Sequence, residues 1–447
     1  MKAEAFAKKV LERATKLGAD QAEVYLETSR QSSVRVHEGE IQDLTQATSK
    51  GLGLRVICGG RLGFACTSDF EGDADDFVKR AVALAQVAAP DENNVLPSAS
   101  DLQPRVTADL QLFDPRVAEL DEGWKIKVSL EMEKAARAAD PRVSKFDSCG
   151  AGDAVSEAYI ASSAGLEDRA RGTYVYLYAS PVASQDGQLQ VGSWSDSKRF
   201  LADLESPEQV GKTAALRATR MLGAKKAKTA KVPVIFDPQI AASFVGSLAG
   251  AVNGDMIFKK ASFLLNKLGE RIAPAGFTVV DDGLLPRGLG TGPWDGEGVP
   301  LRKTAIVEGG VLKSYLYDVH TAHKAKARTT GNASRGYSSL PHIGVNNFYL
   351  EKGNRKPEDL IREVKNGLYV TFMLGRGANT ITGDYSRGAN GIWIENGELA
   401  FPVQECTVAG NLLQMFQAID GIGDDLVFRG GVNAPTLRFS ELTVAGS

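Results

Sequence analysis

The sequence predicts an α+β protein with two parts. The first is an N-terminal α/β domain of mixed or antiparallel strands with helices, and the second is a C-terminal β-rich domain with a helix. Helix-spaced and alternating apolar residues follow one another through the first half of the chain. A lysine-rich stretch, residues 225–231, then separates a helix from a new strand. Beyond it, glycine pairs between short alternating runs indicate β-hairpins. We therefore expect domains at residues 1–224 and 232–447, joined by this linker.

Composition limits the classes of function. The 447 residues suffice for two or three domains, and 52 Lys and Arg nearly balance 55 Asp and Glu, so net charge does not imply a nucleic-acid partner. Four scattered cysteines without a CxxC pair argue against a disulfide framework or a zinc ribbon. Charges interrupt the apolar N-terminus, and no stretch reaches the roughly 18 apolar residues of a membrane span. We expect a soluble, cytoplasmic protein without a membrane partner.

The first elements follow from spacing and turn residues. Apolar residues at helical spacing predict an opening helix that ends at Gly18. Alternating patterns at residues 22–26 and 34–36 predict two strands, and the pair Gly59-Gly60 predicts a hairpin. A second helix is expected over residues 73–88.

The remainder of the first half continues this mixture. Residues 89–121, rich in Pro, Asp and Ser, predict a long surface connection. A helix should run from Glu122 to just before Pro141. Antiparallel strands then turn at residues 185–187, and Ser206 opens a helix as the first residue of a capping box.

The second half begins with a strand and a capped helix. Residues 232–236 are an apolar strand, Asp237 is a helix cap, and Pro238 occupies the first turn. Short hairpins follow, and glycine is dense in residues 374–398. Within that stretch lie Asp384, Tyr385 and Arg387. These three residues either contact a peptide or partner, or lock a turn.

Histidine spacing offers a weak metal-site hypothesis. His320 and His323, three residues apart, would share one face of a helix, as metal ligands require. A surface or hydrogen-bonded role is the favoured interpretation, because no HExxH is present and the neighbouring residues are basic. No serine lies in a G-x-S-x-G elbow. Donors that could complete a metal site are His342, Cys406, Asp281-Asp282 and Asp295-Glu297.

Several segments carry a resemblance to a known family. They are TVVDDG (278–283), WDGEGVP (294–300), TTGN (329–332), ITGDYSRGANGIWIENG (381–397), FPVQECTVAGN (401–411) and the terminal TLRFSELTV (436–444). Together they resemble the TldD/PmbA family, also called modulator of DNA gyrase. The runs TGDYSRGA and VAGNL resemble its PmbA (TldE) branch. The resemblance extends over nearly the whole chain.

The resemblance implies a cytosolic proteolytic assembly. TldD-like subunits carry HExxxH on a helix, bind zinc with a further ligand near the C-terminus, and pair with TldE-like subunits to trim or degrade small or unfolded peptides. The positions corresponding to HExxxH are here Val245, Gly246 and Gly250, which have no zinc-binding side chain. Segment 430–439 also lacks the cysteine of the catalytic branch.

The resemblance therefore favours a non-catalytic subunit without a cofactor of its own. Zinc is expected only in a TldD-like HExxxH partner, and the chain would form a heterodimer with that partner or a homodimer. The alternative is a metal-dependent peptidase in its own right, possibly homodimeric, that uses His320, His323 or His342. A nucleic-acid modulator is suggested only by the family's second name, and the balanced charge gives it no support.

Overall fold

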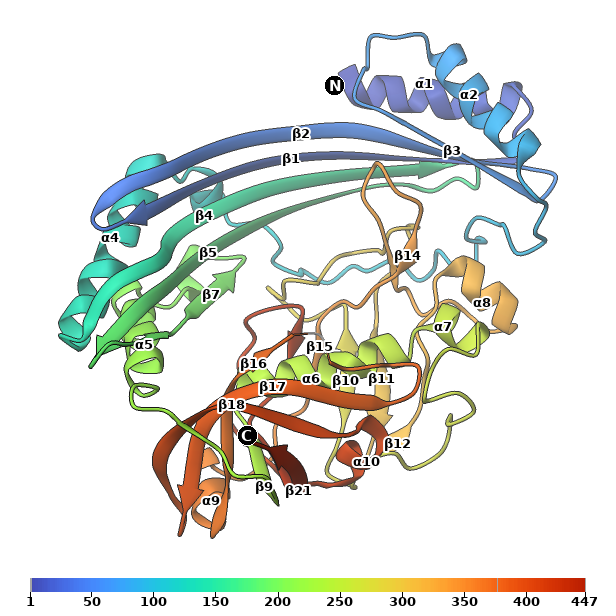
Figure 1. The fold of residues 1–447 in the computed structure, drawn as a ribbon. Coiled ribbons are helices and arrows are strands. Elements are labelled where there is room, and N and C mark those ends of the chain that lie inside the picture. Colours follow the sequence, from blue (N-terminus) through green and yellow to red (C-terminus); the bar gives the residue numbers. More distant parts are fainter. Residues whose placement is uncertain (1, 376, 447) are drawn as a thin grey trace.

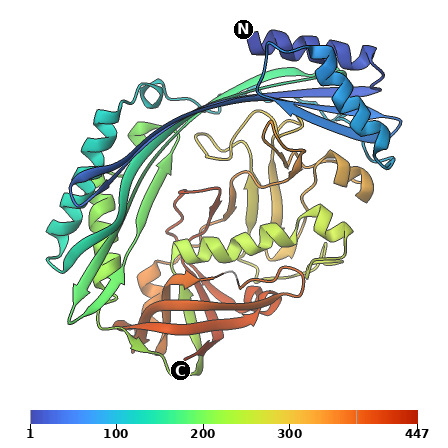
Figure 2. The same cartoon turned by 45° about the horizontal axis from the view of Figure 1, so that its top comes forward.

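The computed structural model describes residues 2–375 and 377–446 (Figure 1). A long, curved sheet from the first half of the chain arches over a second body formed by the C-terminal half (Figures 1 and 2). Helices accompany both parts, and the C-terminal half is rich in strands, which confirms the predicted α+β class. No helix in the described ranges is both long and apolar enough to cross a membrane.

The arch is an antiparallel sheet in the order β3-β2-β1-β4-β5-β6, with β7 paired to β5. Its strands are β1 (Gln21–His37), β2 (Glu40–Cys58), β3 (Arg61–Thr67), β4 (Val143–Ser162), β5 (Glu167–Gln185), β6 (Gln188–Val191) and β7 (Trp194–Lys198). The two strands predicted at residues 22–26 and 34–36 are one strand, β1. Its polar middle hides the continuity in the sequence, although it pairs with β2 and β4 throughout.

Helices cover the two ends of the arch on its outer face (Figure 2). They are α1 (Lys2–Lys16), α2 (Ala74–Val87), α3 (Pro115–Ala118), α4 (Glu122–Ala139) and α5 (Pro207–Thr219), with a 3-10 turn at Leu201–Asp203. Phe6 of α1 and Phe77 of α2 belong to one apolar cluster, whereas Met132 of α4 and Val210 of α5 belong to another. The helices at the two ends of the arch thus pack in separate apolar clusters and not in one shared core.

The C-terminal body contains two larger sheets. The first has the order β12-β11-β10-β15-β20, from β10 (Val279–Asp282), β11 (Lys303–Glu308), β12 (Val311–Leu312), β15 (Phe348–Leu350) and β20 (Val432–Asn433). The second has the order β19-β21-β9-β16-β17-β18-β8. Its strands are β8 (Lys225–Lys226), β9 (Ala230–Phe236), β16 (Asn366–Leu374), β17 (Asp384–Glu395), β18 (Glu398–Asn411), β19 (Ile419–Ile422) and β21 (Leu437–Ala445). Because β18 also pairs with β21, five strands of the second sheet close into a ring.

Shorter elements complete this body. They are β13 (Ala333–Ser334), β14 (His342–Ile343), α6 (Pro238–Ala251), α7 (Gly254–Phe258), α8 (Val319–Ala325), α9 (Pro357–Arg362) and α10 (Leu412–Gln417). Helix α6 lies at the centre, and its Phe244 packs on Phe236, Phe416 and Phe439. The arch ends at Lys198 and β8 begins within the predicted linker; the domain boundaries themselves stay a prediction.

Buried charges join the arch to the C-terminal body. Arg55 of β2 contacts Glu23 of β1, with 3.1 Å between Nη2 and Oε2. The same guanidinium reaches across to Glu297, with 2.8 Å between Nη1 and Oε1. Arg335 contacts the second oxygen of Glu23. We call Glu23, Arg55, Glu297 and Arg335 the buried charge network.

Candidate functional site

Helix α6 is the element in which the family resemblance led us to expect the zinc-binding positions. Asp237 caps it by accepting a hydrogen bond from the Ile240 N–H at 3.0 Å, and Pro238 begins it. Its apolar residues face the core. Beyond Pro238 and Gln239 in its first turn, the residues left at least partly exposed are all small: Ala242, Ser243, Gly246, Ala249 and Gly250. We call them the open face of α6.

The three positions that the resemblance assigns to HExxxH do not share this face. Gly246 and Gly250 lie on it, whereas Val245 is fully buried in the core. A Cβ atom on Gly246 would lie 3.8 Å from Val432 Cγ1, and one on Gly250 would lie 3.3 Å from Thr380 Cγ2. No nitrogen, sulfur or carboxylate donor is present at any of the three positions, so these residues do not fit a zinc ion.

The glycine-rich stretch meets α6 through one of its three candidate residues. Arg387 Nη1 donates to Ser243 Oγ on the open face, at 2.8 Å. Tyr385 is buried, donates to Met373 Sδ at 3.0 Å and packs edge-on against Phe244. Burial raises the pKa of Tyr385 to about 12.

Asp384 has a different environment from its two neighbours. Its carboxylate is exposed and accepts a hydrogen bond from Thr382 Oγ1 at 2.6 Å. This contact joins the first residue of β17 to the turn that precedes the strand. Of the three candidates, therefore, Tyr385 is part of the core, Asp384 holds the turn before β17, and Arg387 contacts the open face.

A pocket of about 500 Å³ opens at the first turn of α6. Trp194 of β7 forms one wall, and its ring centroid lies 5.3 Å from the guanidinium carbon of Arg217 and 4.3 Å from that of Arg429. Arg217 also pairs with Asp237, with 3.0 Å between Nη1 and Oδ2. Ala242 of the open face and Val432, which faces Gly246, line the same pocket. We call it the Trp194 pocket.

Sequence reasoning did not find the Trp194 pocket. Its residues come from the arch, from α5, from α6 and from the last fifth of the chain. No short-range spacing connects Trp194 with Arg217 and Arg429. Only the tertiary structure brings them together, at the junction of the arch and the C-terminal body.

The described structure does not bring the candidate histidines together as a set of metal ligands. His320 Nε2 lies 3.0 Å from Asp91 Oδ2, while His323 and His342 are exposed. Cys406 is buried and its Sγ donates to the Ala389 carbonyl at 3.0 Å. Burial raises the pKa of the Cys406 thiol to about 11. In the part of the chain that the structure describes, no three His, Cys, Asp or Glu residues are grouped to hold a metal ion.

The two acidic clusters are buried among hydrogen-bond donors. Asp281 accepts from Asn332 Nδ2 at 2.6 Å and from the Asn346 N–H at 2.8 Å. Asp295 accepts from the backbone N–H groups of Glu297 at 2.8 Å and Ala333 at 2.9 Å. Glu297 belongs to the buried charge network. These carboxylates therefore fix loops of the C-terminal body.

Comparison with known proteins gives matches along the whole chain. Three family models match in succession: the PmbA/TldA metallopeptidase domain 1 at residues 22–85, the central domain at 115–222 and the C-terminal domain at 229–446. The metalloprotease PmbA of Escherichia coli O157:H7 is 31% identical over 433 residues, which cover 96% of this chain and 93% of that protein. The metalloprotease TldD homologue of Haemophilus influenzae is 26% identical, over 96% of this chain and 93% of that protein.

A solved structure agrees with these sequence matches. It is that of a proposed modulator of DNA gyrase from Bacteroides thetaiotaomicron VPI-5482, with a TM-score of 0.91 and 29% identity over 99% of each chain. The fold, the order of the three matched domains and an identity above 30% over nearly the full length lead to one conclusion. This chain belongs to the TldD/PmbA family.

Proposed function

We propose that this chain is the non-catalytic subunit of a peptidase assembly of the TldD/PmbA family. It pairs with a TldD-like subunit that carries HExxxH and zinc, and it helps to form the cleft that holds a small or unfolded peptide. Its relatives carry metalloprotease names, which supports a role in peptide processing. Its higher identity to PmbA than to TldD, 31% against 26%, supports the TldE-like branch.

The open face of α6 is the observation that carries this proposal. Peptide hydrolysis by a zinc enzyme needs metal ligands and a general base for the attacking water. The aligned positions of α6 hold Val245, Gly246 and Gly250, which supply neither. The exposed side of the helix instead presents small residues beside the Trp194 pocket. Such a surface suits the close approach of a peptide backbone or of a partner.

Arg387 is the residue that we assign to this contact. Its guanidinium lies at the open face, where it donates to Ser243, whereas Tyr385 is enclosed by the core. Arginine presents several N–H donors, so one of them can hold Ser243 while others reach a peptide carbonyl or a partner carboxylate. Ordering a peptide beside the partner's zinc would raise turnover by positioning the scissile bond.

The test is a peptide digest followed by mass spectrometry. It uses this chain alone, an HExxxH-bearing relative from the same cell alone, and the mixture, each with and without a metal chelator. We expect cleavage to be faster in the mixture than with the relative alone, and no cleavage by this chain alone. Arg387→Ala should reduce the stimulation without a large fall in melting temperature. Arg362→Ala on α9, an exposed arginine paired with Asp359, is the matched control and should leave the stimulation unchanged.

Two results would reject the proposal. Cleavage by this chain alone, in a preparation free of the relative, would make it an enzyme in its own right. Equal turnover of the relative with and without this chain would make it a separate binding protein. A melting temperature that falls together with activity in Arg387→Ala would give that residue a structural role only.

The names of the relatives favour a second candidate, a metal-dependent peptidase that acts alone or as a homodimer. His320, His323 and His342 are the residues it would use. Elemental analysis separates the two candidates. About one zinc per chain, lost in His320→Ala or His323→Ala, would support the second candidate.

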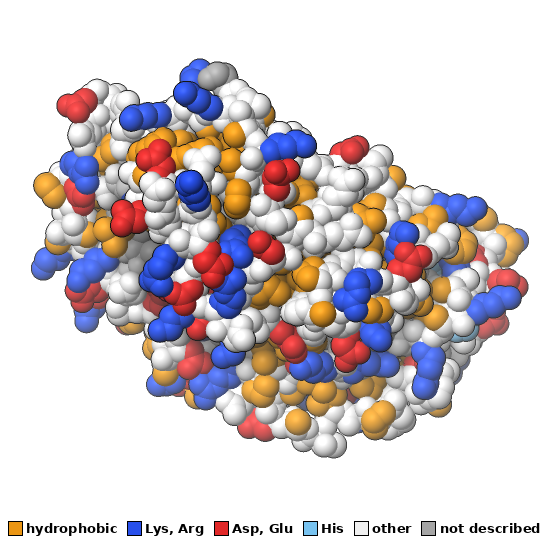
Figure 3. Space-filling view, turned by 90° about the horizontal axis from the view of Figure 1, so that it is seen from below, with side chains coloured by type: hydrophobic (Ala, Val, Ile, Leu, Met, Phe, Trp, Pro, Cys, Tyr) orange, Lys and Arg blue, Asp and Glu red, His pale blue; other side chains and the backbone are white. Residues whose placement is uncertain are grey.

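A nucleic-acid role has weaker support. One solved relative is described as a proposed modulator of DNA gyrase. Figure 3 shows Lys and Arg side chains interspersed with Asp and Glu on the face seen from below, without a continuous basic stripe there. An affinity for DNA that falls steeply with rising salt concentration would support this role.

A further inference from the structure

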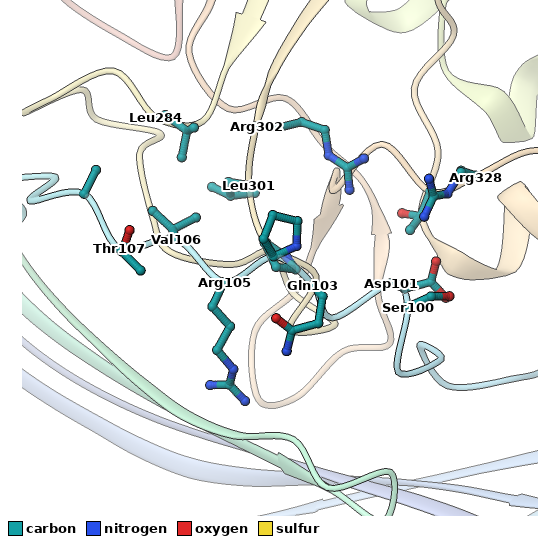
Figure 4. A pocket seen from close by; sticks show the side chains of 14 residues that line it. Ser100, Asp101, Gln103, Arg105, Val106, Thr107, Leu284, Leu301, Arg302 and Arg328 are labelled. Carbon is teal, nitrogen blue, oxygen red and sulfur yellow. The ribbon is translucent and has the colours of Figure 1, made fainter.

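A second pocket lies between the connection that follows α2 and the C-terminal body (Figure 4). Its volume is about 450 Å³, and it shares no lining residue with the Trp194 pocket. One wall comes from residues 100–108, and the others come from Leu284, residues 300–302 and residues 328–329. This volume is within the range of small-ligand sites. We call it the arginine pocket.

Two of its arginines have no carboxylate partner among the described residues. Arg302 and Arg328 line the pocket, and neither forms an ion pair or donates a side-chain hydrogen bond to another of residues 2–375 and 377–446. Figure 4 shows both side chains on the same side of the pocket. Two neighbouring guanidinium groups repel each other unless an anion lies between them.

The other charged residues of the pocket are already engaged. Arg105 points away from Arg302 and Arg328 in Figure 4 and pairs with Asp168, with 2.9 Å between Nη1 and Oδ2. Asp101 is the acidic residue of the lining, and its Oδ2 accepts from the N–H and Oγ of Ser98 at 2.9 and 2.6 Å. The pocket therefore presents two unpaired positive charges and one carboxylate that is hydrogen-bonded elsewhere.

We propose that the arginine pocket binds a small ligand through an oxyanion, held between Arg302 and Arg328. The planar guanidinium matches the oxygens of phosphate and carboxylate groups, and two of them favour an anion over any neutral ligand. The Gln103 amide and the Thr107 hydroxyl line the pocket as further donors.

The apolar part of the lining limits the rest of the ligand. It consists of aliphatic side chains and prolines, and it contains no aromatic ring: Pro104, Val106, Ala108, Leu284, Pro300 and Leu301. A nucleobase would find no stacking surface here, whereas a compact aliphatic group would fit. The expected ligand therefore carries an oxyanion and, beyond it, at most a small aliphatic group. Inorganic phosphate and the C-terminal carboxylate of a short aliphatic peptide are the two sources to distinguish.

The titration of Arg302 is consistent with this site. Burial lowers the pKa of Arg302, and the positive charge of Arg328 lowers it further, while Asp295 and Asp101 oppose the change. A bound oxyanion would relieve the repulsion between the two guanidinium groups. The inference does not depend on the proposed function, because no residue of α6 or of the Trp194 pocket takes part.

The experiment is isothermal titration of the full chain with three probes: inorganic phosphate, the dipeptide alanyl-leucine and its C-terminal amide. We expect saturable binding of phosphate, or of the free dipeptide but not of the amide. Arg302→Gln and Arg328→Gln should each weaken that binding by about tenfold or more, because each removes a charged hydrogen bond to the anion. Added salt should weaken it as well.

Arg105→Gln is the matched control, because Arg105 lines the same pocket but is paired with Asp168. It should leave the affinity unchanged, and melting curves should show that all three variants are folded. Saturable phosphate binding that requires Arg302 and Arg328 identifies phosphate as a source, and the dipeptide result identifies a carboxylate. The proposal is overturned if none of the probes binds saturably at about 10 mM. It is also overturned if Arg105→Gln weakens binding as much as Arg302→Gln does.

Discussion

The buried charge network and the open face of α6 are opposite kinds of surface in the same molecule. The network places four charged side chains, each less than a tenth exposed, between the arch and the C-terminal body. The open face presents small, uncharged residues. The buried charges thus lie at the structural junction, whereas the open face carries no charged side chain. Charge joins the two parts of the molecule, and the surface that we propose for a peptide or a partner lacks side-chain bulk.

This comparison explains why the acidic motifs were ambiguous in the sequence. Asp295 and Glu297 were possible metal ligands by type alone. Their oxygens are instead occupied by backbone N–H groups and by Arg55. A buried charge needs such partners, because an unpaired one is costly.

The largest effect is expected from breaking the network. Arg335→Ala would leave Glu23 buried with one partner fewer, and its guanidinium also lies 5.0 Å from the Tyr25 ring centroid. Loss of one partner of a buried pair costs about 3–5 kcal/mol of the free energy of unfolding. Denaturant unfolding measures this cost. Arg169→Ala, which breaks the more exposed pair with Glu4, should cost about 1 kcal/mol or less.

Similar losses of unfolding free energy in Arg335→Ala and Arg169→Ala would contradict the stabilising role of the buried charge network. The network would then contribute no more than an ordinary surface ion pair. A double variant that also removes Glu23 offers a further check. If Glu23 is left uncompensated in the single variant, its removal should recover part of the lost stability.

A smaller effect is expected from pH. Burial raises the pKa of Asp295 above its ordinary value, and the charge of Glu297 adds to this, while three backbone N–H donors oppose it. Above a pH of about 4 the folded state then holds a proton that the unfolded state has lost, so the free energy of unfolding falls as pH rises. Each unit of raised pKa corresponds to about 1.4 kcal/mol. Denaturant unfolding at several pH values should show that the free energy of unfolding falls more steeply from pH 5 to 8 in wild type than in Asp295→Asn.

If the free energy of unfolding depended on pH equally in both proteins, the backbone donors would be keeping Asp295 ionised. The comparison would then be sharper, because a carboxylate beside the buried charge network would also be held in its charged form. The absolute stability of Asp295→Asn is less informative than the slope. Its amide nitrogen cannot accept the N–H bonds that the carboxylate accepts.

Local signals in the sequence were sufficient for several helix caps and for one of the hairpin turns. Ser206 and Asp237 cap helices as expected, and the Gly59-Gly60 turn joins β2 to β3. These features depend on a few neighbouring residues and on backbone geometry. The family resemblance likewise rests on short motifs, and the comparisons confirm it.

Long-range geometry could not be predicted in this way. The continuity of β1 depends on pairing with two other strands, because its own middle is polar. Arg387 and Ser243 are 144 residues apart, and Arg335 and Glu23 are 312 apart, so no spacing rule connects them. The Trp194 pocket is likewise built from distant segments. The candidate site was therefore predicted as separate pieces, and the structure shows which of them touch.

The smallest effect concerns the open face itself and is a gain in stability. Glycine within a helix costs about 1 kcal/mol relative to alanine, because it loses more backbone entropy on folding. A Cβ on Gly246 would meet only Val432 Cγ1, at an ordinary contact distance of 3.8 Å, so Gly246→Ala should raise the free energy of unfolding by about 0.5–1 kcal/mol. Gly250→Ala is the matched comparison. Its Cβ would lie 3.3 Å from Thr380 Cγ2, and the helix ends one residue later, so its gain should be smaller or absent.

Denaturant unfolding gives the stability of both variants, and the digest with the HExxxH-bearing relative measures how strongly each variant stimulates cleavage. If the small residues serve the cleft, Gly246→Ala should be more stable yet stimulate the relative less, a combination that a purely structural glycine would not produce. A variant that is more stable and equally stimulating would separate the open face of α6 from function.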